Sequence, residues 1–356
     1  MFATCAVYYG FLFVIFSKNN FQIRAIVMFH ISYHASHEQF SPSDLLGYVK
    51  LAEKVGFTAC HSSDHFHPWS KRQGQSGYAF SWMGAAMEAT HFPFSIITAP
   101  GQRYHPAIVA QAIATLSEMY PERLEVALGS GEALNEHITG EPWSDKALRN
   151  QRLFECADVI RKLLNGETVN HSGLVKVHEA KLYTLPVKVP GLMCAALSKE
   201  TAHWAGRWAD GLLTIYQPKE KLREVIDAFR INGGEGKPIH VQMAFSYARN
   251  ENVAKSHAHH QWRSNSISKD KLGDLSTVEH FDAASEHITE EEVISGIPVS
   301  SSTQFFADLL TAAAELDIDN LILHNINLLQ KDFIEDFGNE VLPVVLEKII
   351  KKDLKK

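Results

Sequence analysis

One pattern recurs eight times along the sequence: a short apolar run is followed by a stretch whose apolar residues have helical spacing. Such runs predict buried strands, and the stretches between them predict helices that cover those strands. Eight alternations predict an α/β fold, a parallel sheet closed into a (β/α)8 TIM barrel, with insertions after strands 4 and 7. The expected strands are residues 28–33, 57–61, 94–98, 124–128, 192–196, 212–216, 239–247 and 321–324.

The helices between these strands carry their own end signals. For the first, Ser41 is a typical N-cap, Pro42 suits the first turn and Gly56 is a typical stop. The other expected helices are residues 80–89, 106–120, 147–164, 199–208, 219–229, 303–316 and 331–352, with a hairpin near residues 171–173. An open doubly wound sheet is the alternative, but no GxGxxG motif follows the first strand.

Composition and charge narrow the function classes. Hydrophobic residues make up 45% of the chain and charged residues 21%, which is typical of a globular protein. The formal net charge of −7 gives no basic surface for nucleic acid or for acidic lipid, so we expect no nucleic-acid partner and no membrane requirement. Cys5, Cys60, Cys156 and Cys194 form no CxxC pair, which favours reduced thiols and a cytoplasmic location.

The first 27 residues do not continue the barrel pattern. Residues 1–16 are almost wholly apolar, but they lack the basic start and the cleavage site of a signal peptide and are short for a membrane helix. We expect residues 1–27 to be an apolar extension that is not native to the protein, and residues 28–356 to be a single barrel. A membrane-associating tail and a packed first segment are the alternatives.

Polar and ionisable residues follow the expected strands where parallel barrels place their active sites. Glu38 follows the first strand, Asp64, His65 and Trp69 follow the second, and Glu132 follows the fourth. A carboxylate next to an imidazole can select its tautomer, and the imidazole can then move protons near neutral pH. An indole supplies a flat wall for a ring. The pattern therefore predicts a site for a planar ligand with an acid and a base.

Each of these short strings also has a structural interpretation. Asp64 and His65 could cap a helix and hydrogen-bond a loop, and residues 129–132 could form a plain strand-to-helix turn, although Gly131 would let the backbone approach a flat ligand. His65 and His67 form an HxH pair, which raises a metal-dependent barrel hydrolase as an alternative. Ser198 is a typical N-cap for the next helix, or a phosphate contact at its start.

Four strings together resemble the luciferase-like flavin and deazaflavin oxidoreductases. They are residues 33–40 (YHASHEQF), 63–69 (SDHFHPW), 103–106 (RYHP) and 129–136 (GSGEALNE). The resemblance covers about residues 29–346, and the most similar branch is that of the dehydrogenases that act on glucose 6-phosphate with the deazaflavin coenzyme F420. A subgroup proposed to use an ordinary flavin is more similar still.

The resemblance implies roles for the matching residues. His65 would be the base, Trp69 would stabilise the reacting centre, Glu132 would protonate the ring or orient the substrate, and Glu38 would support that pair. The residues implied in cofactor binding are Asp64, Ile96, Ile97, Thr98, Gly131, Asn135, Ala196, Leu197 and Ser198. Residues 96–98 would form a bulge behind the ring, often with a non-proline cis peptide in this family. A homodimer is also implied.

One departure from the family pattern concerns the cofactor. The F420-dependent sugar dehydrogenases have a Gly-Gly pair where this chain has Leu197-Ser198. Side chains there would crowd a polyglutamate tail, whereas Ser198 could bind a terminal phosphate, which favours FMN over coenzyme F420. The basic residues that would bind a sugar phosphate also find no match, apart from Lys219 as a candidate.

Three hypotheses follow for the function. The first is redox catalysis, in which reduced FMN or deazaflavin serves hydride transfer or oxygen-dependent oxidation of a small organic substrate. The second is metal-dependent hydrolysis through His65 and His67. The third is a flavin-binding protein without catalysis.

Overall fold

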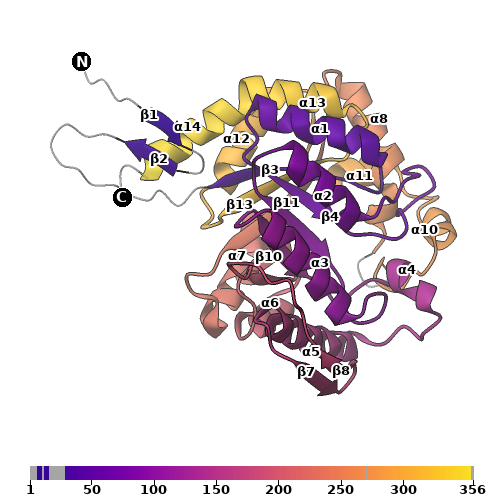
Figure 1. Ribbon diagram of the computed structural model, residues 1–356. Helices are drawn as coiled ribbons and strands as arrows, with labels where there is room; N and C mark the ends of the chain where they lie inside the picture. The colour runs from indigo at the N-terminus through magenta and orange to yellow at the C-terminus, as the bar shows by residue number, and fades with distance from the viewer. Residues whose placement is uncertain (1–5, 10–11, 16–28, 269–271, 354–356) are drawn as a thin grey trace.

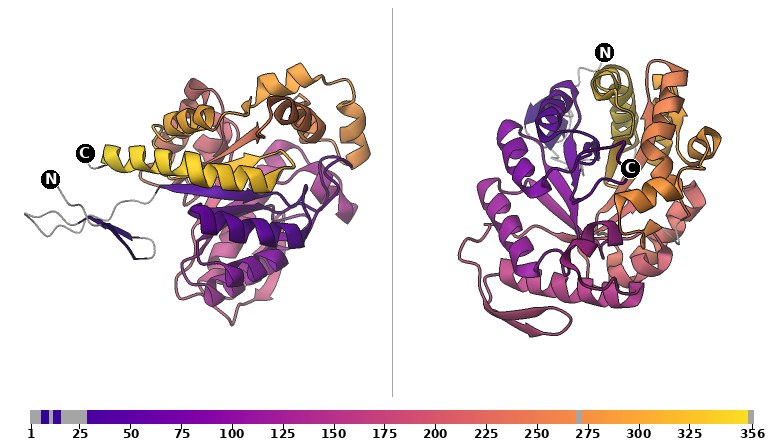
Figure 2. Two further views of the ribbon diagram at one scale, coloured as in Figure 1. Left: turned by 90° about the horizontal axis from the view of Figure 1, so that it is seen from above. Right: turned by 90° about the vertical axis from the view of Figure 1, so that its right-hand side faces the viewer.

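Eight parallel strands close into a barrel in the computed structural model, which describes residues 6–9, 12–15, 29–268 and 272–353. The order around the barrel is β3-β4-β5-β6-β9-β10-β11-β13, and pairing of β10 with β11 and of β13 with β3 closes the ring. Helices surround the strands (Figures 1 and 2). The predicted (β/α)8 TIM barrel is confirmed.

The strand predictions are accurate to about two residues. The strands are β3 (His30–Ala35), β4 (Ala59–Ser63), β5 (Phe94–Thr98), β6 (Leu124–Leu128), β9 (Leu192–Ala195), β10 (Leu212–Ile215), β11 (Ile239–Tyr247) and β13 (Asn320–Asn325). Prediction succeeded here because a strand that is buried on both faces is a nearly continuous apolar run.

The covering helices follow the predicted ranges. They are α1 (Pro42–Val55), α2 (Ala79–Ala89), α3 (Pro106–Met119), α5 (Lys146–Leu164), α6 (Lys199–Gly206), α7 (Lys219–Phe229) and α12 (Thr303–Ala313). In α1 the Ser41 hydroxyl accepts from the Asp44 amide, and Gly56 ends the helix with φ +107°, as predicted. The last helix is interrupted: a π-helical turn (Phe337–Val341) separates α13 (Gln330–Asp336) from α14 (Leu342–Asp353).

Both insertions lie where the sequence predicts them. After β6 come the short helix α4 (Ala133–Glu136), α5, and the hairpin of β7 (Val169–Ser172) with β8 (Lys176–Ala180). After β11 come α8 (Glu251–Trp262), α10 (Val278–Ala284), α11 (Glu290–Gly296) and the short strand β12 (Val299–Ser300). These helices pack around Phe281 in a second apolar cluster.

Of the first 27 residues, the structure describes only a two-stranded antiparallel sheet of β1 (Ala6–Tyr9) and β2 (Leu12–Ile15), which is separate from the barrel sheet. The rest of that predicted extension lies outside the described residues, so its origin stays a prediction. Over the described ranges, no helix combines the length and the apolar character that crossing a bilayer requires.

Histidines fill half of the barrel interior. His34, His61, His240 and His324 are buried there, and the ring of His34 lies 4.2 Å from that of His324 and 5.5 Å from that of His61, centroid to centroid. The other half is aliphatic and consists of Ile97, Ala127, Met193, Leu213 and Ile322. Burial lowers the pKa of His61 and of His240 to about 3, and that of His324 to about 4. The interior is therefore packed with neutral imidazoles.

We predict that acid destabilises the fold through these histidines. Their pKa is lower in the folded chain than the value of about 6.5 expected in the unfolded chain, so the unfolded chain binds more protons as the pH falls. The free energy of unfolding should fall between pH 6 and pH 5 by about 1.4 kcal/mol per pH unit for each such histidine. His61→Gln should reduce that slope by one proton in urea titrations, whereas replacing exposed His91 should not; equal slopes would contradict the prediction.

Candidate active site

Glu38, His65 and Glu132 meet at the carboxyl end of the barrel, although they are far apart in the sequence. The His65 Nε2 atom lies 3.6 Å from Glu38 Oε1. Asn135 Nδ2 lies 3.2 Å from His65 Nδ1 and 3.5 Å from Glu132 Oε2. The ring of Trp69 lies against that of His65, with 5.3 Å between centroids. The structure thus brings together all four residues that the sequence suggested as catalytic.

The environment holds Glu38 ionised. Ser63 Oγ donates to Glu38 Oε1 at 2.7 Å, and Ser36 Oγ donates to Glu38 Oε2 at 2.9 Å. Burial alone would raise the pKa of Glu38, but the charge of His65 and the hydrogen bond from Ser63 outweigh it, and the net pKa is lowered. Neither serine was suggested by the sequence patterns, because a hydroxyl near a strand end carries no distinctive signal.

The surroundings of Glu132 shift its pKa in the opposite direction. Its pKa is raised, first by burial and further by the negative charge of Glu38, although His65 opposes the shift. A carboxyl with a raised pKa holds its proton at a higher pH and can serve as an acid. The surroundings of the two carboxyls therefore shift their pKa values in opposite directions, and His65 lies between them.

Asn135 selects the tautomer of His65. Its Oδ1 atom accepts from the amides of Phe66 at 2.8 Å and His67 at 3.2 Å, so the side-chain orientation is determined by two donors. The Nδ2 group therefore donates to His65 Nδ1, and a neutral His65 carries its proton on Nε2, facing Glu38. The role of Asn135 in cofactor binding stays a prediction; in the structure its side chain contacts the loop after β4 and His65.

Asp64, expected to contact the ring, is instead the centre of a buried polar cluster. Its Oδ2 accepts from Thr98 Oγ1 at 2.7 Å and from Arg103 Nη2 at 3.3 Å, and its Oδ1 accepts from the Tyr104 hydroxyl at 3.2 Å. Arg103 also reaches Glu136: its amide donates to Glu136 Oε2 at 2.7 Å, and its Nε lies 3.6 Å from Glu136 Oε1. Arg103 thereby connects the loops that follow β4, β5 and β6.

The predicted bulge at residues 96–98 is wrong. Among the described residues every peptide bond is trans, and β5 pairs with β6 in an unbroken register from Phe94 to Thr98. Ile96 faces the helices and is buried in the main core, Ile97 faces the barrel interior, and Thr98 binds Asp64. The side chain of Ile96 therefore cannot reach a ligand at the carboxyl end, since strand side chains alternate between faces.

The remaining expected cofactor contacts lie at the ends of β6 and β9. Gly131 has φ +80°, and a Cβ there would come within 3.0 Å of Glu136 Cγ, so both the conformation and the space call for glycine. Ala196 is buried, while Leu197 is 61% exposed. Ser198 is the N-cap of α6, because its hydroxyl accepts from the Thr201 amide.

The metal alternative finds little support in this geometry. His65 Nδ1 faces Asn135, and His67 Nδ1 is 3.0 Å from the Leu134 carbonyl oxygen. Within the described part of the chain, no group of three or more His, Cys, Asp or Glu side chains has an arrangement that could hold a metal ion. The HxH pair therefore functions here as two loop contacts.

Comparison with known proteins identifies the family. The profile of the luciferase-like monooxygenases matches residues 22–319. The chain belongs to this family. It is an oxidoreductase of the luciferase-like type, as the resemblance implied, and the hydrolase alternative is excluded by this membership.

Individual relatives are similar over nearly their whole length. The chain is 32% identical to an F420-dependent glucose-6-phosphate dehydrogenase of Beutenbergia cavernae over 330 residues, 89% of this chain and 97% of the relative. An F420-dependent secondary alcohol dehydrogenase, solved with an F420-acetone adduct, has a TM-score of 0.82 at 29% identity and covers 89% of this chain and 99% of its own. An EDTA monooxygenase of Chelativorans, at 13% identity and a TM-score of 0.69 with 90% and 94% coverage, shares the fold.

We predict that removing Arg103 destabilises the protein strongly. Arg103→Leu leaves the Asp64 and Glu136 carboxylates buried without their cation, which should cost about 3–5 kcal/mol of unfolding free energy. Arg161→Leu is the matched control, because its partner Asp210 is half-exposed and such surface pairs contribute about 1 kcal/mol or less. Urea unfolding measures the free energy of unfolding of both variants. Equal losses of free energy would show that the buried cluster around Arg103 stabilises the protein no more than the surface pair does.

We also predict that Asn135→Asp reverses the His65 tautomer. A carboxylate at this position accepts instead of donating, so the proton of neutral His65 should move from Nε2 to Nδ1. The ¹⁵N chemical shifts of the His65 ring report which nitrogen is protonated. The same spectrum of Asn135→Gln is the control for local disturbance, and an unchanged Nε2–H tautomer in Asn135→Asp would refute the assignment.

Proposed function

We propose that the protein is a deazaflavin-dependent dehydrogenase that transfers hydride between a small alcohol-type substrate and reduced or oxidised coenzyme F420. The observation that carries this proposal is the chain of contacts from Glu38 through His65 and Asn135 to Glu132, with Trp69 against His65. The F420-dependent relatives at about 30% identity support the choice of coenzyme. When bound, the coenzyme supplies the hydride acceptor or donor.

Ionised Glu38 accepts the substrate proton in this proposal, and His65 orients the substrate hydroxyl towards it. Because Nδ1 of His65 accepts from Asn135, its Nε2 carries a proton and cannot take a second one. The Nε2–H of neutral His65 can donate to the substrate oxygen while the hydroxyl proton passes to Glu38 Oε1, which lies 3.6 Å from Nε2. Glu38, whose pKa is lowered and which is therefore ionised, is the final acceptor.

Glu132 serves as the acid on the other side of His65. Its raised pKa keeps its proton available, and the small residue Gly131 beside it gives a flat ligand close access to the backbone. Trp69 is held by an edge-on contact with Phe281, 5.2 Å between centroids, and presents a flat apolar wall. These residues bind and orient the ligands, and they supply one proton donor and one proton acceptor.

FMN is the second candidate cofactor, and one observation favours it. Leu197 and Ser198 stand where F420-dependent relatives have two glycines, and the exposed Leu197 side chain projects where a long tail would lie. With FMN, a monooxygenase reaction becomes the alternative chemistry. We further propose a cytoplasmic homodimer that acts on a small molecule; the buried free thiols Cys60, Cys156 and Cys194 suit a reducing compartment.

The direct test is a fluorescence titration of the purified protein with coenzyme F420 and with FMN. We expect F420 to bind at micromolar concentration or tighter. Tighter binding of FMN would favour the second candidate, and binding of neither would overturn the proposal. Glu132→Gln should bind the preferred cofactor normally and lose turnover, which separates a catalytic defect from a binding defect.

We predict that the pH dependence of turnover reports Glu132. A proton donor loses activity as the pH rises through its pKa, and because the pKa of Glu132 is raised, this decline should lie above the range of an ordinary carboxyl. The measurement is kcat/KM against pH for the native enzyme and for Glu132→Gln. The variant should be roughly 10²–10⁴-fold slower and should lack the alkaline decline; an identical decline would assign it to another group.

A further inference from the structure

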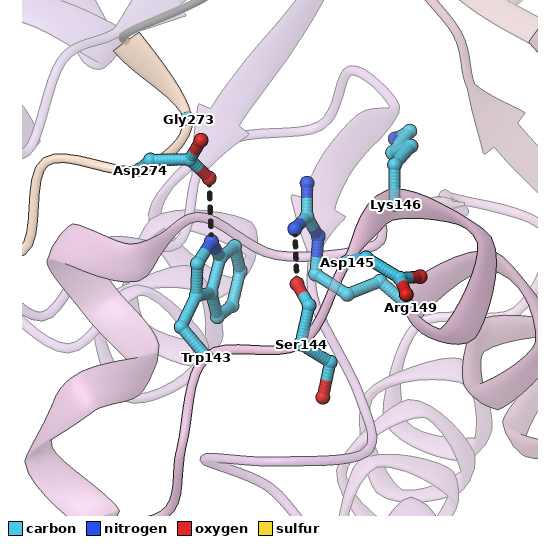
Figure 3. Close-up of a pocket in the computed structure, with 7 residues that line it drawn as sticks. All are labelled: Trp143, Ser144, Asp145, Lys146, Arg149, Gly273 and Asp274. Carbon is cyan, nitrogen blue, oxygen red and sulfur yellow. Dashed lines mark hydrogen bonds between the residues drawn. The ribbon is translucent and has the colours of Figure 1, made fainter.

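A cleft of about 530 Å³ opens beside the candidate active site and is not used by the mechanism above. It lies between the start of α5 and the segment that follows α8, as Figure 3 shows. Its lining comprises Trp143, Ser144, Asp145, Lys146, Arg149, Gly273 and Asp274. A smaller hollow shares Trp143 and Arg149 with it and extends to Ser130 and Gly131, at the end of β6. The two hollows therefore adjoin, and the smaller one borders Gly131, the residue before Glu132.

Three cations project from one side of α5 into these two hollows. Lys146, Arg149 and Arg152 are spaced three residues apart, so they share a helix face. Among the residues that the structure describes, none of the three makes an ion pair with a carboxylate, whereas most other basic clusters of the chain do. Positive charges gathered without a carboxylate partner favour the binding of an anion.

The walls of the cleft are held in place by specific contacts. The Arg149 guanidinium lies over the Trp143 ring, 4.3 Å from its centroid, and donates to the Ser144 carbonyl. Arg152 Nη2 donates to Ser144 Oγ at 3.0 Å. Asp274 Oδ1 accepts from the Trp143 indole at 3.0 Å, visible in Figure 3. The arginines are therefore preorganised on a rigid wall.

The two carboxylates of the cleft are already engaged with donors. Asp145 is the N-cap of α5, because its Oδ1 accepts from the Leu148 amide at 2.8 Å. Asp274 accepts from Trp143. The 19-residue helix α5 begins at this point, and the Asp145 carboxylate already offsets the partial positive charge of its N-terminus.

Lys146 connects the cleft to the active-site end of the barrel. Its Nζ donates to Ser130 Oγ at 2.7 Å. Burial and the charge of Arg149 lower the pKa of Lys146, while Cys194 at the end of β9 and Glu132 act on it in the opposite direction. The ammonium therefore lies within electrostatic reach of both β6 and β9, where a tail leaving a ring beside Glu132 would run.

We propose that Lys146 and Arg149 bind the phosphate ester group of the ligand that occupies the carboxyl end of the barrel. A phosphate is the anion that an ammonium, a guanidinium and a helix N-terminus bind together most strongly. The group belongs either to the cofactor or to a phosphorylated substrate. This inference rests on the proposed function, and it gives the chain a phosphate anchor that does not need the Ser198 hydroxyl, which caps α6.

The test compares ligands with and without the phosphate; FMN and riboflavin differ only in this group, whereas the deazaflavin core also lacks the tail of coenzyme F420. The affinities of FMN and riboflavin, and of coenzyme F420 and its phosphate-free deazaflavin core, are measured by fluorescence for the native protein, Lys146→Gln and Arg149→Gln. The native protein should prefer the phosphorylated member of a pair by tenfold or more, and each variant should lose about tenfold of that preference, an effect of the size expected for a charge-assisted hydrogen bond. Affinity for the phosphate-free member should change less than twofold.

Lys162→Gln is the control, since Lys162 lies on the same helix, carries the same charge and pairs with Asp158 at the surface. It should leave every affinity unchanged. Circular dichroism and the melting temperature verify that each variant folds.

Inorganic phosphate distinguishes the source of the group. Its binding, followed by ³¹P NMR, should weaken in Lys146→Gln; displacement by FMN or F420 would assign the site to the cofactor, and binding alongside them would assign it to the substrate. Unchanged ligand preference together with unchanged phosphate binding in both variants would overturn the inference. Failure of the native protein to bind any flavin or deazaflavin would instead refute the proposed function, and the phosphate titration would still test the cleft.

Discussion

The active-site end of this barrel depends on one buried guanidinium. Arg103 follows β5, and it pairs with Asp64 after β4 and with Glu136 after β6. All three side chains are nearly inaccessible, so their charges interact through a medium of low polarity and no water can replace a missing partner. Because His65 follows Asp64 directly and Glu132 begins the turn that contains Glu136, this one cation sets how the proposed base and acid lie relative to each other.

From that constraint the difference between the two carboxyls follows. Glu38 is reached by two serine hydroxyls and by His65, all of which favour its ionised form. Among the residues that the structure describes, Glu132 takes only the longer contact with Asn135, so burial dominates and favours its protonated form. The barrel thus obtains an acceptor and a donor from the same residue type, and Asn135 gives His65 the tautomer that connects them.

Sequence reasoning succeeded where the physical signal is local or topological. Periodicity located the strands, Ser41 and Gly56 marked the ends of α1, and the rule that parallel strands share one edge brought Glu38, His65, Trp69 and Glu132 together. It failed where a role depends on a partner distant in sequence. Asn135 meets His65 across 70 residues, Arg103 meets Asp64 across 39, and nothing near either residue indicates the contact. The bulge at residues 96–98 was carried over from the family, and the regular pairing of β5 with β6 contradicts it.

The residues Leu197 and Ser198 after β9 and the residue Lys146 at the start of α5 can be considered together. This chain has an exposed Leu197 at the end of β9, where the resemblance implies a glycine, and the Ser198 hydroxyl is used as a helix cap. A ligand phosphate near that strand end then needs another group to bind it. Lys146 interacts electrostatically with Cys194 and donates a hydrogen bond to Ser130 at the end of β6. An ammonium on a flexible stem tolerates a bulkier neighbour better than a pair of backbone amides does, because it can move while it keeps its charge near the anion. In the proposed assignment the ring and the phosphate are therefore bound by different elements, the loops after β4 and β6 for the first and the start of α5 for the second.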